Sequence, residues 1–103
     1  MRVAFDVDGT LYTFAQTANK EMLSTLLLFC NLGCDVVIWS SKGKQYAEDA
    51  AYALGVSDRV QCLSKGDIAP DLTFDDENIP LGRTNILVPL SYQVQYLAYR
   101  SEQ

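Results

Sequence analysis

The chain has 103 residues, of which 49% are hydrophobic and 20% are charged, and its formal net charge is −5. This length and composition are typical of one globular domain, here residues 1–103, whose core can form without disulfide bonds. The acidic balance argues against broad nucleic-acid binding, and the absence of histidine excludes histidine-based catalytic triads and histidine-ligated zinc.

A strand followed by a helix is predicted in the first third of the chain. Residues 2–7 form a short apolar run that ends in Asp-Gly, the pattern of a buried strand that leads into a turn. From about residue 17 to residue 32, apolar side chains recur at helical spacing: Met22, Leu23, Leu26, Leu27 and Cys30. Gly33 follows, in the position where helices commonly end.

The same order of elements is then repeated. Residues 35–39 are an apolar, strand-like run, and a helix follows with one apolar face: Tyr46, Ala47, Ala50, Ala51 and Leu54. Three more strands are predicted at residues 59–63, 71–74 and 85–88, while residues 91–103 fit a helix or a strand, with a helix favoured. This alternation predicts a three-layer, Rossmann-like α/β fold around a mostly parallel five-stranded sheet, covered on both faces.

The location and redox state of the protein are also expected from the sequence. No apolar run reaches the roughly 20 residues that span a bilayer, and the first residues lack the features of a secretory signal. Cys30, Cys34 and Cys62 are odd in number and follow no metal-binding spacing, so we expect small, buried, reduced side chains. We therefore expect a soluble, cytoplasmic protein that does not contact a membrane.

Polar side chains that could take part in catalysis or binding lie at the ends of four predicted strands: Asp6 with Asp8, Ser40, Lys65, and Asp75 with Asp76. Ligands of open parallel sheets bind beyond the carboxyl ends of the strands, so we expect these side chains at one edge. Asp6 and Asp8 are two residues apart, and on an extended strand both would project to the same side and repel each other.

A divalent cation would resolve this repulsion among the carboxylates. At about 4 Å and an effective dielectric constant near 20, each pair of like charges costs on the order of 4 kcal/mol. Oxygen ligands without nearby histidine or cysteine favour a hard ion, and a site completed by water and a phosphate group suits Mg²⁺. The sequence therefore predicts a magnesium site formed by aspartates.

Four segments together resemble a known family. "VAFDVDGT", "VVIWSS", Lys65 and "LTFDD" are similar, in that order, to the four motifs of the haloacid dehalogenase-like hydrolase superfamily. They extend over residues 3–76, and the Asp-x-Asp-Gly-Thr stretch is the most specific of them. The connections after the first two motifs are too short for an inserted domain, so the chain resembles a small member without a cap domain.

The resemblance implies a Mg²⁺-dependent phosphomonoester hydrolase, that is, a phosphatase, with a role for each matching residue. Asp6 would be the nucleophile that forms an aspartyl-phosphate, and Asp8 would be the general acid and base. Ser40 and Lys65 would bind the phosphoryl group. Mg²⁺ would be held by the Asp6 carboxylate, the backbone carbonyl of Asp8, Asp75 and Asp76. Because relatives that dehalogenate lack the second aspartate, Asp8 favours phosphate chemistry.

Alternatives stay open for two of these residues and for the function. Ser40 could instead cap the following helix, with Ser41 as the working hydroxyl, and Lys42 or Lys44 could take the place assigned to Lys65. The chain could also be a phosphotransferase of the same superfamily, or a non-catalytic phosphate- or Mg²⁺-binding module similar to a response-regulator receiver.

The absence of a cap domain leaves the expected site open. The phosphorylated substrate could therefore be large, including a macromolecule, or a second copy of the chain could cover the site in a homo-oligomer. Tyr12 and Phe14, in the short segment after the first motif, are candidates for contact with the substrate, and packing over the sheet edge is an equal alternative.

Overall fold

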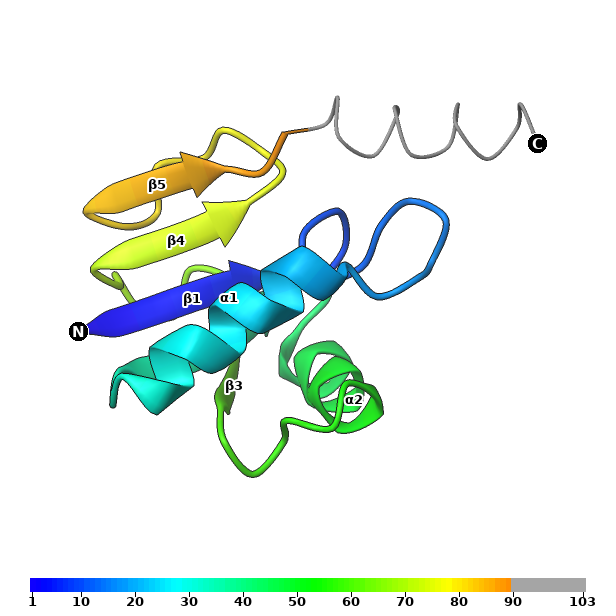
Figure 1. Ribbon diagram of the computed structural model, residues 1–103. Coiled ribbons are helices and arrows are strands. Elements are labelled where there is room, and N and C mark those ends of the chain that lie inside the picture. Colours follow the sequence, from blue (N-terminus) through cyan, green and yellow to red (C-terminus); the bar gives the residue numbers. More distant parts are fainter. Residues whose placement is uncertain (90–103) are drawn as a thin grey trace.

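The computed structural model describes residues 1–89 (Figure 1). In chain order the elements are β1 (Arg2–Asp6), α1 (Lys20–Asn31), β2 (Asp35–Ser40), α2 (Lys44–Ala53), β3 (Gln61–Ser64), β4 (Leu72–Asp75) and β5 (Thr84–Leu87). The strands and helices predicted within residues 1–89 are present at close to their predicted bounds. Residues 91–103, where the sequence favours a helix, lie outside the described residues.

The five strands form one parallel sheet in the order β3-β2-β1-β4-β5. β1 lies at its centre, where Asp6 pairs with Trp39 of β2 and Phe5 pairs with Phe74 of β4. The predicted α/β fold with a parallel five-stranded sheet is thus confirmed, and residues 1–89 contain no separate cap domain.

Local signals set both ends of α1. The side chain of Asn19 accepts a hydrogen bond from the N–H of Met22 (3.3 Å), which caps the start of the helix. Gly33 has φ +82° and donates its N–H to the carbonyl of Cys30 (3.1 Å), so the helix ends where the glycine predicts. No helix in residues 1–89 has the length and apolar character needed to cross a membrane.

The larger core cluster lies on the face of the sheet that both helices cover. It includes Phe5 and Phe74, whose rings stack with centroids 4.7 Å apart, and Leu26 of α1 and Ala51 of α2. The chain crosses the sheet in one direction from β1 through β2 to β3, and right-handed crossovers then place both helices on one side (Figure 1).

The opposite face of the sheet carries a smaller cluster of Ala4, Val37 and Trp39. Within the described residues, side chains from the connecting segments pack against it, including Ile68 and Leu81. Trp39 is fully buried, as expected for a packing residue. Among residues 1–89, short connections rather than helices supply the apolar side chains that cover this face.

The three cysteines form no disulfide bond in the structure. Each is half-buried, whereas the sequence predicted small, buried side chains. Cys30 and Cys34 lie at the end of α1 and just beyond it, and Cys62 lies in the edge strand β3, where solvent reaches part of each side chain. Position at the ends and edges of elements explains the partial exposure.

Candidate functional site

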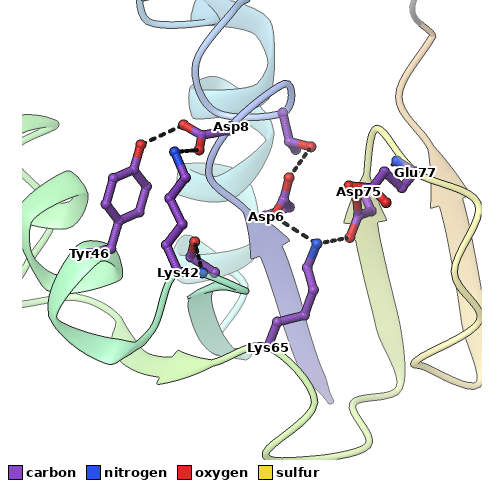
Figure 2. Close-up of polar contacts among 9 residues, drawn as sticks. Asp6, Asp8, Lys42, Tyr46, Lys65, Asp75 and Glu77 are labelled. Carbon is purple, nitrogen blue, oxygen red and sulfur yellow. Dashed lines mark hydrogen bonds and ion pairs between the residues drawn. The ribbon is translucent and has the colours of Figure 1, made fainter.

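A buried lysine joins two aspartates at the carboxyl ends of the strands (Figure 2). Nζ of Lys65 lies 3.0 Å from Oδ1 of Asp6 and 2.8 Å from Oδ2 of Asp75. The side chains of these three residues are 9%, 7% and 6% exposed, respectively. Because the charges are held away from water, their mutual attraction is only weakly screened.

The sheet topology places these three groups together. Asp6 and Asp75 are the last residues of the neighbouring strands β1 and β4. Lys65 directly follows β3, and its N–H donates to the carbonyl of Ser40 (3.0 Å). Oδ1 of Asp75 accepts the N–H of Glu77 (2.9 Å), which orients the carboxylate and leaves Oδ2 to Lys65.

Asp76 completes a group of carboxylates that could hold a cation. Asp6, Asp75 and Asp76 each offer a ligand oxygen, and these oxygens all lie within 4.8 Å of one another. This donor set of hard oxygens fits a divalent cation such as Mg²⁺. Gly9 makes room for the Asp76 carboxylate, because a Cβ at this position, where φ is +83°, would collide with it.

The electrostatics of the site follow from burial and from the close charges. Burial raises the pKa of Asp6 to about 7, the charge of Asp75 acts in the same direction, and the bond to Lys65 opposes both. Burial also raises the pKa of Asp76 above its ordinary value. For Lys65, burial acts to lower the pKa, but the bonds to Asp75 and Asp6 outweigh it and the pKa is raised.

Asp8 has partners of its own, on the other side of the β1 end (Figure 2). Its Oδ1 accepts a hydrogen bond from the hydroxyl of Tyr46 (2.7 Å), and its Oδ2 lies 3.1 Å from Nζ of Lys42. The same Nζ lies 4.8 Å from the centre of the Tyr46 ring. The strand ends at Asp6, so the extended backbone that would place Asp6 and Asp8 on one side is absent.

The serine and lysine alternatives differ clearly in position. Ser40 is the last residue of β2 and is buried, while Ser41 is exposed. Ser40 does not cap α2, whose N-cap is Gly43 without a side-chain bond; its Oγ accepts the N–H of Lys42 (3.0 Å). Lys44 is exposed and lies 3.8 Å from Glu48, whereas Lys65 contacts Asp6 directly.

Two residues that the sequence analysis did not assign to the site contact it. Thr10 is fully buried, and its hydroxyl lies 3.5 Å from Oδ2 of Asp6 as a long hydrogen bond. Its place in the Asp-x-Asp-Gly-Thr stretch could have indicated this contact. Tyr46 was expected only on the apolar face of a helix; its ring does pack against the core, but its hydroxyl reaches Asp8.

Comparisons with known proteins add no family assignment to this geometry. No protein-family model, no curated protein and no solved structure matches the chain. The similarity to the haloacid dehalogenase-like hydrolases therefore rests on the motifs quoted above, and the function has to be inferred from the site.

Proposed function

We propose that the protein is a Mg²⁺-dependent phosphomonoester hydrolase that works through a phosphorylated Asp6. The observation that carries this proposal is the contact of Lys65 with both aspartates: its Nζ lies 3.0 Å from Asp6 and 2.8 Å from Asp75. A carboxylate can attack a phosphate dianion only if positive charge offsets their repulsion. Lys65 supplies positive charge beside Asp6. A cation held by Asp6, Asp75 and Asp76 would supply more.

In the first step, a carboxylate oxygen of Asp6 forms a bond to phosphorus as the bond from phosphorus to the leaving oxygen breaks. Asp8 gives its proton to that leaving oxygen, so the product is a neutral alcohol. Lys65 holds Asp6 in place through the 3.0 Å contact. The Ser40 hydroxyl, which accepts a bond from Lys42, keeps its own hydrogen for a phosphoryl oxygen.

In the second step, a water oxygen attacks the phosphorus and the bond to Asp6 breaks. Asp8 takes the proton from this water and is then ready for the next cycle. Mg²⁺, when bound by Asp6, Asp75, Asp76 and the backbone carbonyl of Asp8, would neutralise charge on the phosphoryl oxygens. The odd number and the spacing of the three cysteines, which indicate no disulfide framework, support the cytoplasmic location that we infer for this activity.

The first test is hydrolysis of p-nitrophenyl phosphate in the presence and absence of Mg²⁺. We expect turnover that depends on Mg²⁺ and that falls more than about a thousandfold in Asp6→Asn, because the nucleophile is lost. Asp58→Asn makes the same exchange at an exposed aspartate outside the site and should keep wild-type turnover. Wild-type protein that hydrolyses no member of a broad phosphate panel would instead favour a phosphate-binding module.

The intermediate itself can be detected with Asp8→Asn. Because p-nitrophenolate leaves without much acid assistance, the first step should persist while activation of the water fails. Mass spectrometry of the variant mixed with p-nitrophenyl phosphate and Mg²⁺ should then show one added phosphoryl group, located on Asp6. An added alcohol that becomes phosphorylated in place of water would identify the phosphotransferase alternative.

A further inference from the structure

A small pocket lies beside Asp8, between α2 and the segment that follows β1. Its volume is about 240 Å³, and it is lined by Val7, Tyr12, Gln16, Tyr46, Asp49, Ala50 and Ala53. A cavity of about 150 Å³ can hold a benzene ring. This pocket is therefore large enough for one six-membered ring with a substituent.

Two of the lining residues tie the pocket to Asp8. Tyr46 donates its hydroxyl to Oδ1 of Asp8 at 2.7 Å. Tyr12 forms an isolated bridge with Asp8, and its carbonyl accepts the N–H of Gly9 at 2.8 Å. In the proposed reaction Asp8 protonates the leaving oxygen, so the leaving group has to lie next to Asp8. The pocket adjoins Asp8 through the Tyr46 that lines it.

The segment that forms the outer wall is held in shape by its own hydrogen bonds. Thr13 donates its N–H to the carbonyl of Thr17 (2.8 Å), and their hydroxyl groups are 2.8 Å apart. Tyr12 pairs with Ala18 in an antiparallel bridge, and Gln16 takes a positive φ of 62° that closes the turn. The wall is thus a tight turn closed by its own hydrogen bonds.

The chemistry of the lining selects the ligand. Two tyrosine rings, a valine and two alanines present flat or small apolar surfaces, which favour contact with an aromatic ring. The charged side chain in the lining is Asp49, so a negatively charged group placed in the pocket would be repelled. Building on the proposed function, we infer that the substrate is an aryl phosphate monoester whose ring carries no negative charge.

Phosphonates test this inference without needing turnover, because their carbon–phosphorus bond is not hydrolysed. Calorimetric titration of wild-type protein with Mg²⁺ should give an affinity for benzylphosphonate at least about tenfold above that for methylphosphonate, the gain expected from a ring in an apolar pocket. Ala53→Leu, an exposed position, should remove most of this preference by filling the pocket. Ala15→Leu makes the same exchange on the turn outside the pocket and should retain it.

A second pair of measurements tests the charge requirement. A carboxyl group in the para position of benzylphosphonate should weaken binding several-fold, and Asp49→Asn should recover most of that loss. Equal affinity for benzylphosphonate and methylphosphonate, or a preference that survives Ala53→Leu, would overturn the inference, as would failure to bind either compound. A ring preference without hydrolysis of any phosphate would overturn the proposed function and leave the pocket assignment intact.

Discussion

Replacement of Lys65 by methionine tests whether this lysine holds the carboxylates of the site together. Its Nζ lies 3.0 Å from Asp6 and 2.8 Å from Asp75, so each attraction amounts to about 5 to 6 kcal/mol at an effective dielectric constant near 20. Much of this gain is offset by the cost of burying the ammonium group. Removing one partner of a buried ion pair generally costs about 3 to 5 kcal/mol, and we expect a loss in this range.

The sign of the pH dependence follows from the raised pKa of Asp6, which is about 7 with Lys65 in place. A carboxyl group whose pKa is raised by folding stabilises the protein at low pH and loses that contribution as pH rises through the folded pKa. Without Lys65 the pKa rises further, so the variant keeps losing stability above pH 7. The difference in unfolding free energy between wild type and Lys65→Met should therefore grow from pH 6 to pH 8.

Urea unfolding in metal-free buffer measures this difference, with the fluorescence of Trp39 as the probe. Trp39 is the single tryptophan of the chain and is fully buried, so its emission reports loss of the core. Lys44→Met is the matched control, because Lys44 is 64% exposed and its 3.8 Å pair with Glu48 should contribute less than about 0.5 kcal/mol. Equal destabilisation by the two substitutions would refute the reasoning.

Three further predictions concern the other parts of the site. Gly9→Ala should lose about 1 to 2 kcal/mol in urea unfolding because φ is +83°, and should weaken Mg²⁺ binding by displacing Asp76; Gly66→Ala, with φ +93° in open space, should show only the loss of stability. Tyr46→Phe should lower kcat/KM for p-nitrophenyl phosphate about tenfold, because the 2.7 Å hydrogen bond to the proposed acid–base is lost; unchanged kinetics would contradict the positioning role. Calorimetry should show Mg²⁺ affinity falling as pH drops below 7, because the cation must displace a proton from Asp6; an affinity constant from pH 6 to 8 would argue against this ligand.

The sequence predicted the strands well, but their ends only approximately. Apolar runs predicted ends at Trp39, Leu63 and Phe74, and each strand continues for one more residue, to Ser40, Ser64 and Asp75. Hydrogen bonding between neighbouring strands, rather than hydrophobicity, determines where a strand ends, and Ser40 pairs with Ser64. Ser40 and Asp75, two polar residues of the site, are therefore part of the sheet itself.

Sequence reasoning grouped Asp6, Lys65, Asp75 and Asp76 at one edge because parallel strands all end there. It could not separate Lys65 from Lys42 or Lys44, since a long flexible side chain can reach several places from the same edge. That distinction depends on side-chain packing: Lys65 is 9% exposed, whereas Lys42 is 61% exposed and pairs with Asp8. The pattern of a sequence does not contain this information.

The separation of Asp6 from Asp8 also could not be read from the sequence pattern, and it bears on the proposed mechanism. The sequence suggested two carboxylates that share one side of a strand, but β1 ends at Asp6 and the chain turns, so Asp8 bonds with Tyr46 and Lys42 instead. The proposed reaction requires Asp6 to attack as a carboxylate, a form that the contact with Lys65 favours and that burial opposes. The turn after β1 thus gives the two neighbouring aspartates separate partners, with Asp6 beside the cluster that could hold a cation and Asp8 outside it.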